Sequence, residues 1–390
     1  MPPTGMGGEG DAMTSSYPQC VPVLDDGRVR LRAMTPADLP AVVEQSTDPE
    51  TLRWTTVPSP YGPDDAAEFL EHIGSQWEDE GGVRIFVVEL TGGDGEEEAP
   101  FAGLLDLRPG PSLQHPWEVG FATHPAVRGR GVMTAAMRLG AAWAFEQGAP
   151  SLYWYANVGN WGSRRVAWRV GMTDHGTLPQ RVPGRDGAVM DAWCASLLPG
   201  QEMSPRTPWV VPPVLTDGSV RLRPWRDDDR ASVQEPDHPS HHVPARALPT
   251  AQTWDAWLDR RRHAMASGSG VNWCVADAQS DVALGEVLVF VHGGTLADGD
   301  TAELGYFLYP RARGRGVAKA AAALAAEHAL TPRESGGLSL RRLVAQTAAD
   351  NAASNAVLSF AGFSRWGHEA AATAPDGSVG PADHWERVRP

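Results

Sequence analysis

Two short runs of alternating arginine and glycine contain the side chains best suited to bind an anion. Both read "RGRG", at 128–131 and at 313–316, and a predicted helix follows each of them. Backbone N–H groups at the start of a helix lack partners and lie at the positive end of the helix dipole. Glycine lets the backbone approach a bulky anion, and arginine adds charged, forked donors. Each run therefore predicts a cradle for a diphosphate, with its first arginine facing the solvent.

A single run of this kind would fit a solvated basic turn. Two runs that both lie between a predicted strand and a predicted helix favour the anion cradle over that interpretation. Neither run has the Gly-Lys-Ser/Thr of a P-loop or the spacing of a dinucleotide-binding glycine motif. The residues that we assign to the two cradles are Arg128, Gly129, Arg130, Gly131, Val132, Met133 and Thr134, and Arg313, Gly314, Arg315, Gly316, Val317, Ala318 and Lys319.

An acidic residue lies two positions before the glycine of the strand that leads to each run. These acids are Glu118 in "WEVGFAT" and Glu303 in "AELGYFL". Each interrupts an otherwise apolar strand, and burial there would raise its pKa. Such a carboxylate could take a proton from an amine. A solvated glutamate or a structural ion pair fits the same pattern, so both interpretations stay open.

These features belong to a repeat that occupies both halves of the chain. "DGRVRLRAMTPAD" at 26–38 matches "DGSVRLRPWRDDD" at 217–229, and "NWGSRRVAWRVGM" at 160–172 matches "NAASNAVLSFAGF" at 351–363. The matches keep their order, which indicates a duplicated domain. We predict domains at 20–198 and 214–390, a proline-rich linker at 199–213, and a disordered tail at 1–19 without the features of a secretory signal.

Within each copy, the hydrophobic patterns predict strands that alternate with helices. In the first copy, alternating Val29 and Leu31 predict a strand, which a helix at about 36–46 follows. Further strands are predicted by apolar runs at 84–90, 101–107, 117–123, 151–157 and 188–197. Helices are predicted within the segments at 61–77, 132–147 and 161–172. The fold class is therefore α/β, a mixed sheet with helices packed on it.

Composition excludes several classes of function. The net charge of −15 argues against a nucleic-acid partner, because phosphate contacts need a basic surface. No apolar run reaches the length of a membrane span, and the three widely spaced cysteines suggest a reducing, cytoplasmic location. The histidines of "HPSHH" at 238–242 have no second ligand cluster nearby in the sequence. We interpret them as a solvated loop and expect no metal.

The cradle pattern resembles the Arg/Gln-x-x-Gly-x-Gly/Ala loop with which GNAT acetyltransferases hold the pyrophosphate of coenzyme A. Arg313, Gly316 and Ala318 match the pattern fully. Arg128 and Gly131 also match, but Met133 stands where glycine or alanine is usual. The segments "GVMTAAM", "VRLRAMTPAD" and "TTVPSPYG" are similar to the branch that acetylates N-terminal amines of ribosomal proteins.

The resemblance implies two tandem GNAT-like domains that use acetyl-CoA as co-substrate and no metal. It places the pantetheine arm along Phe121, Ala122 and Thr123, or Phe307 and Leu308, and near Asn160 and Asn351. The family's usual tyrosine is replaced by Ala167 and Leu358, so Ser163 and Ser354 become candidate donors to the departing thiolate. A serine that only hydrogen-bonds backbone at a helix start fits equally.

The implied acceptor is an amine, either a peptide N-terminus or a small molecule such as an amino sugar or an antibiotic. A coenzyme A sensor or scaffold, in which one or both copies lack catalysis, is the alternative. The sequence does not determine the oligomeric state.

Two cradles predict two coenzyme A sites in each chain. Calorimetric titration should give two sites whose affinity falls as ionic strength rises, because the contacts are charge-assisted. A single site would mean that one copy is a scaffold.

Overall fold

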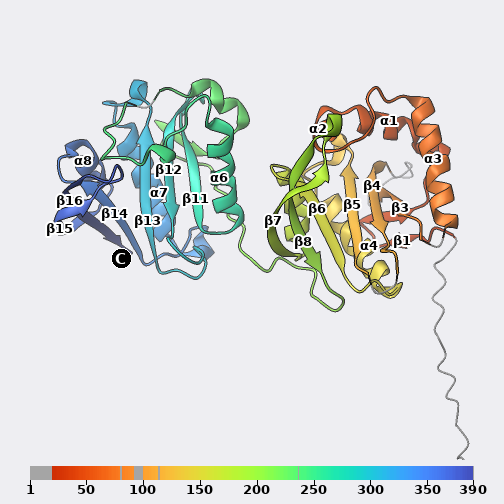
Figure 1. The fold of residues 1–390 in the computed structure, drawn as a ribbon. Coiled ribbons are helices and arrows are strands. Elements are labelled where there is room, and N and C mark those ends of the chain that lie inside the picture. The colour runs from red at the N-terminus through yellow and green to blue at the C-terminus, as the bar shows by residue number, and fades with distance from the viewer. Residues whose placement is uncertain (1–19, 80, 92–99, 113–114, 236, 390) are drawn as a thin grey trace, which may run out of the picture. The chain divides into compact units, whose positions relative to one another are not determined.

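The computed structural model describes residues 20–79, 81–91, 100–112, 115–235 and 237–389. The tail predicted at 1–19 lies outside this range. The chain folds into two compact units, and the boundary between them falls between Arg206 and Thr207. Figure 1 shows that each unit contains a sheet with helices packed on it. The α/β class and the tandem arrangement of two similar domains are thus confirmed. Within the described residues, no helix is both long and apolar enough to span a membrane.

The N-terminal unit has eight strands in the order β1-β2-β3-β4-β5-β6-β8-β7. Its strands are β1 (Leu24–Asp25), β2 (Val29–Arg32), β3 (Arg84–Leu90), β4 (Phe101–Arg108), β5 (Trp117–Thr123), β6 (Leu152–Asn157), β7 (Thr173–Pro183) and β8 (Val189–Leu197). Its helices are α1 (Leu39–Thr47), α2 (Pro49–Trp54), α3 (Pro63–Glu78), α4 (Val132–Glu146) and α5 (Trp161–Arg169). The edge strand β7 is exposed almost throughout and was not predicted.

The C-terminal unit repeats this sheet, in the order β15-β16-β14-β13-β12-β11-β10-β9. Its strands are β9 (Leu215–Thr216), β10 (Val220–Arg223), β11 (Gly270–Asp277), β12 (Ala283–Phe290), β13 (Thr301–Leu308), β14 (Arg342–Ala348), β15 (Ser364–Thr373) and β16 (Val379–Val388). Its helices are α6 (Trp254–Ala266), α7 (Val317–Leu330) and α8 (Ala352–Phe360). Short 3-10 turns at Asp227–Ser232 and Ala245–Ala247 take the place of α1 and α2.

One pair of neighbouring strands in each sheet is parallel, and it stays paired over only three residues. Trp117–Val119 of β5 pairs with Leu152–Trp154 of β6, and Thr301–Glu303 of β13 pairs with Arg342–Val344 of β14. Beyond these residues, β5 continues to Thr123 on its pairing with β4, and β13 continues to Leu308 on β12. The two parallel strands therefore diverge toward their carboxyl ends. We refer to this opening as the splay.

A helix begins directly beyond the longer strand of each splay. Helix α4 packs against β4 so closely that a Cβ added at Gly140 would lie 2.4 Å from Leu105 Cδ2. Leu105 and Leu107 therefore face α4, and the alternating residues Asp106 and Arg108 face away from it. Helix α7 follows β13 in the same way and buries a row of alanines against the sheet.

The repeated "VRLR" phrase has a structural role. Arg32 donates two hydrogen bonds to the carboxylate of Asp38, and Arg223 donates two to Asp229, at 2.7 and 2.8 Å in both cases. Burial would raise the pKa of Asp38, but the hydrogen bonds from Arg32 and Thr35 outweigh it and hold the pKa below its usual value. Each pair fixes the turn that follows the first long strand of its unit.

The proline-rich segment between the units is attached at both ends. Its first part contacts the N-terminal unit, where Arg138 Nε donates to the Met203 carbonyl at 3.0 Å. Its last part contacts the C-terminal unit, where Trp273 Nε1 donates to the Pro213 carbonyl at 2.9 Å. The domain limits at 198 and 214 stay predictions, although the division of the chain after Arg206 falls between them.

The variant Arg223→Met should destabilise the C-terminal unit by about 3–5 kcal/mol, because it leaves the buried Asp229 carboxylate without its partner. Urea unfolding measures the loss. Arg221→Met is the matched control, because Arg221 lies on the same strand but is 41% exposed in its ion pair with Asp281. Equal losses in the two variants would show that burial of the pair contributes nothing.

Candidate active site

The glycines of both arginine-glycine runs have the left-handed backbone conformation that favours glycine. Gly129 and Gly131 have φ of 77° and 76°, and Gly314 and Gly316 have φ of 72° and 79°. Gly131 and Gly316 are the N-cap residues of α4 and α7, and neither helix has a side-chain cap. The first N–H groups of both helices thus have no side-chain cap, as a backbone anion site would require.

The first arginine of the N-terminal run is exposed, as expected, but partners from other segments also hold it. Arg128 Nη2 lies 2.5 Å from Asp48 Oδ2 and donates to Thr51 Oγ1 at 3.1 Å, while its Nε donates to the Thr123 carbonyl at 3.3 Å. The hydrogen bond from Arg128 lowers the pKa of Asp48. Arg128 therefore connects the end of β5 to the start of α2.

Arg313 makes the same connection in the C-terminal unit. Its Nη2 lies 2.5 Å from Asp237 Oδ1 and 3.0 Å from His238 Nε2, and its Nε donates to the Leu308 carbonyl at 3.3 Å. The hydrogen bond from Arg313 lowers the pKa of Asp237. The sequence missed this role in both copies, because Asp48 and Asp237 are each more than 75 residues from their arginine.

Other cations surround the N-terminal cradle. Arg130 is exposed, and Arg28 Nη2 donates to its carbonyl at 2.5 Å. A Cβ added at Gly131 would lie 3.3 Å from Arg28 Nη2 and 3.9 Å from Arg169 Nη1. Arg28 and Arg169 come from the turn before β2 and the end of α5, and sequence reasoning did not assign them to the site.

The C-terminal cradle has fewer cations. In the repeat, Ser219 and Phe360 take the places of Arg28 and Arg169. Arg315 is exposed, and Lys319 Nζ lies 5.5 Å from the centre of the Phe360 ring. The two cradles thus share a backbone conformation but differ in charge.

Two carboxylates and one arginine lie together at the base of the N-terminal splay. Arg108 Nη1 lies 2.5 Å from Glu118 Oε1, and Arg108 Nη2 lies 2.5 Å from Asp106 Oδ2. Asp106 pairs across the sheet with Gly120, the first residue of β5 beyond its pairing with β6. Burial raises the pKa of Asp106, the charge of Arg108 opposes this, and the charge of Glu118 adds to it. Sequence analysis proposed Glu118 and missed Asp106, although an acid at an alternate position of "FAGLLDL" was visible.

The side chains of Asp106 and Arg108 explain why position 120 is a glycine. A Cβ added there would lie 2.6 Å from Asp106 Oδ1 and 2.8 Å from Arg108 Nη2. The Asp106 carboxyl therefore occupies the space that a side chain at position 120 would need, directly beside the splay.

The C-terminal unit lacks this arrangement. The cross-strand register places Leu288 opposite Gly305 and Phe290 opposite Glu303, where the N-terminal unit has Asp106 and Arg108. Glu303 contacts His292 instead, with 2.7 Å between Oε2 and Nε2. Glu118 and Glu303 thus each contact a basic side chain, the kind of structural contact that the sequence had left open for both.

Comparison with known proteins decides the family. The family model described as "Acetyltransferase (GNAT) domain" matches residues 28–173 and again residues 219–364. The chain belongs to the GNAT acetyltransferase family. No curated protein matches it in sequence.

Solved GNAT structures resemble one half of the chain. A GNAT acetyltransferase from Bacillus anthracis is 19% identical, with a TM-score of 0.39 over 45% of this chain and 98% of its own. RimL, a ribosomal L7/L12 alpha-N-protein acetyltransferase in complex with coenzyme A, is 14% identical, with a TM-score of 0.40 over 45% of this chain and 98% of its own. Mycobacterium smegmatis RimJ in complex with CoA-disulfide is 20% identical, with a TM-score of 0.39 over 48% of this chain and 92% of its own.

In both GNAT units, the asparagine assigned to the pantetheine arm caps a helix. Asn160 Oδ1 accepts from the Ser163 N–H, and Asn351 Oδ1 accepts from the Ser354 N–H, both at 3.1 Å. Ser163 Oγ accepts a hydrogen bond from Trp154 Nε1 at 3.0 Å. Each asparagine therefore fixes the start of its helix beside the splay, and its contact with a cofactor stays a prediction.

Ser354 has a different partner. Its Oγ lies 2.6 Å from Tyr306 Oη, and burial raises the pKa of Tyr306 to about 12. Tyr306 takes the place of Phe121 in the repeat, so this hydroxyl pair between β13 and α8 is specific to the C-terminal GNAT unit.

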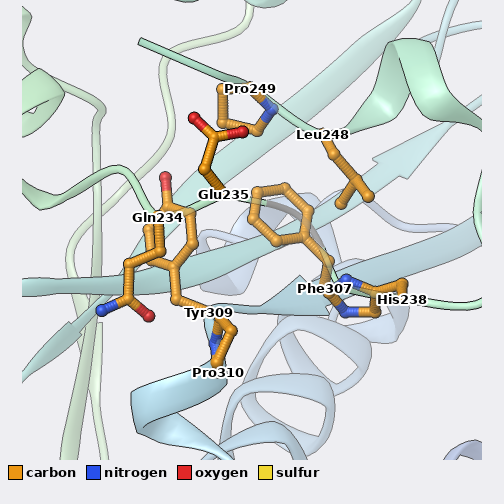
Figure 2. A pocket seen from close by; sticks show the side chains of 8 residues that line it. All are labelled: Gln234, Glu235, His238, Leu248, Pro249, Phe307, Tyr309 and Pro310. Atoms are coloured by element: carbon orange, nitrogen blue, oxygen red, sulfur yellow. The ribbon is translucent and has the colours of Figure 1, made fainter.

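The side chains of several predicted residues are buried rather than available to a ligand. Met133 is 3% exposed and lies in the core with Val132, so its departure from the family pattern does not place a thioether at the anion site. Phe307 lines a cavity of about 10 Å³ with Leu248, Tyr309 and other residues, as Figure 2 shows. That volume holds one water at most. Phe307 and Leu308 could therefore contact a cofactor only through their backbone.

The variant Gly120→Ala should lower acetyl transfer by about 10²-fold, because the added Cβ displaces the Asp106 carboxyl from the splay. A rate assay on folded protein, checked by circular dichroism, measures this. Gly305→Ala is the matched control, because the added Cβ would meet apolar side chains, with Leu288 Cδ2 at 3.1 Å and Phe290 Cε1 at 3.6 Å. A larger loss in Gly305→Ala would assign the reaction to the other unit.

Proposed function

We propose that the N-terminal unit transfers an acetyl group from acetyl-CoA directly to a primary amine. The observation that carries the proposal is the group formed by Asp106, Arg108 and Glu118 at the base of the splay. It combines a partly buried carboxyl, whose pKa is raised, with a second carboxylate, beside the strand edge that the family resemblance assigns to pantetheine.

The cradle of the N-terminal unit fits the pyrophosphate of coenzyme A. The uncapped start of α4 offers backbone N–H groups, and Arg130, Arg28 and Arg169 add positive charge. The backbone of Phe121–Thr123 lies beyond the end of the β5–β6 pairing, where amide groups of pantetheine could bind. The acetyl group would then lie near Gly120 and the acids.

Acetyl-CoA supplies the thioester whose carbonyl carbon the neutral amine attacks. The new C–N bond replaces the C–S bond, the amine loses a proton, and the sulfur leaves as a thiolate that must gain one. Asp106 and Glu118 are the proposed proton acceptors, because both carboxylates lie at the base of the splay. Burial raises the pKa of Asp106, and a base with a raised pKa is better matched to an amine near neutral pH. Ser163 is the proposed donor to sulfur, since its oxygen accepts from Trp154 and its own proton can be donated.

The acceptor is proposed from charge and resemblance. The net charge of −15 favours a cationic, amine-bearing molecule. The segments similar to the N-terminal-amine branch favour a peptide N-terminus, and a small amine such as an amino sugar fits the same reaction.

The C-terminal unit supports a second candidate function, a coenzyme A-binding or structural domain without catalysis. Leu288 and Phe290 replace the acid and the arginine of the N-terminal unit. Its cradle keeps the backbone conformation, which supports binding, but has lost two of the flanking arginines.

The variants Asp106→Asn and Glu118→Gln should each lower kcat by about 10²–10⁴-fold with little change in coenzyme A affinity, because each removes a proton acceptor. Release of thiol from acetyl-CoA in the presence of mixed amines measures the rate, and calorimetry measures the affinity. Glu303→Gln is the matched control and should retain full activity. Loss of activity in Glu303→Gln alone would place catalysis in the C-terminal unit, and full activity in all three would mean that another group takes the proton.

A further inference from the structure

Two neighbouring histidines of the C-terminal unit face one carboxylate from a distant turn. His241 Nε2 lies 3.2 Å from Asp350 Oδ2, and His242 Nε2 lies 3.1 Å from Asp350 Oδ1. The two imidazole rings are 4.2 Å apart and inclined by 63°. Asp350 follows β14 and directly precedes Asn351, the N-cap of α8.

The arrangement has the ligand types and the spacing of a metal site. One ligand atom from each of the three residues lies within 4.8 Å of the others. Imidazole nitrogen and carboxylate oxygen bind Zn²⁺ at about 2.0–2.2 Å, so ligand atoms in a tetrahedral site are about 3.3 Å apart. Each imidazole nitrogen lies near this distance from one oxygen of Asp350, a different oxygen in each case, so either carboxylate oxygen can serve as the third ligand. Water can supply the fourth ligand.

The surroundings support a cation at this place. A second acid, Asp376, lies close by and accepts from Ser240 Oγ at 2.7 Å. His238 faces Arg313 instead, which excludes it from the ligand set.

In the N-terminal unit, the turn before the capping asparagine is contacted by a tryptophan instead. Gly159 takes the position of Asp350 in the repeat, and a Cβ added there would lie 3.2 Å from the Trp54 ring. Trp54 is the last residue of α2, the helix that begins after Asp48 and is held by Arg128, and His241 and His242 follow Asp237 on the loop that Arg313 holds. Helix α2 in one unit and loop 237–243 in the other thus contact the turn that precedes the capping asparagine.

We propose that His241, His242 and Asp350 bind a divalent metal ion of the zinc type, which fastens loop 237–243 to the turn before α8. The metal takes the role that the Trp54–Gly159 contact has in the N-terminal unit. Sequence analysis interpreted these histidines as part of a solvated loop. It missed the third ligand because Asp350 lies 108 residues after His242. The site is independent of the proposed acetyl transfer.

The test is a calorimetric titration of the untagged, chelator-treated full chain with ZnCl₂. One Zn²⁺ per chain should bind, and His242→Ala or Asp350→Asn should weaken binding by more than about tenfold, the least that loss even of an outer-shell partner usually costs. Asp350→Asn keeps the shape and hydrogen-bonding capacity of the side chain, so it separates metal ligation from a hydrogen bond. His384→Ala is the matched control, because His384 contacts a single acid, Glu369, in the same unit.

A second measurement locates the bound ion. Hydrogen exchange with and without Zn²⁺ should show slower exchange at 237–243 and 349–352, and Co²⁺ should give the absorption bands of a four-coordinate site. The proposal is overturned if the wild type binds no Zn²⁺, or if the double variant His241→Ala/His242→Ala binds it as tightly as the wild type does.

Discussion

The short parallel pairing of β5 with β6, and of β13 with β14, is the constraint on which the site depends. Because each pairing covers only three residues, the remainder of β5 and β13 keeps one neighbour through β4 or β12 and turns its other edge toward the opening. The helix that follows begins at the end of the same strand. One break in the sheet therefore brings together a strand edge, the start of a helix and the side chains of the adjacent strand.

The two units keep this backbone arrangement and differ in the side chains around it. Positive φ at the glycines, the arginine that returns to the strand carbonyl and the asparagine cap occur in both units, since each fixes the path of the chain. Asp106 and Leu288 occupy equivalent positions on the face of the sheet away from the following helix, where the fold accepts either residue. The polar groups of the N-terminal splay are therefore not required for folding, which supports a chemical role for them.

Sequence patterns predicted the features that local chemistry determines. The alternation of Val29 and Leu31 predicted β2, and the arginine-glycine runs predicted uncapped helix starts, because strand periodicity and glycine conformation depend on near neighbours. Strand β7 was missed because its glycine and two prolines give no apolar alternation, and its pairing with β8 holds it in place. The roles of Arg28, Arg169 and Arg128 also escaped prediction, because each depends on a partner from a distant segment.

The first arginine of each run connects the strand end to a distant segment, which is α2 in the N-terminal unit and loop 237–243 in the C-terminal unit. Arg128 and Arg313 each bind a backbone carbonyl and the aspartate at the start of this segment, so its first part is fixed in the same way in both units. The second contact of the segment, with the turn before the asparagine cap, has no such backbone requirement. It is an indole against a glycine in one unit and two imidazoles against a carboxylate in the other. The segment could therefore change its chemistry at its far end while the strand, the helix start and the cap kept their positions.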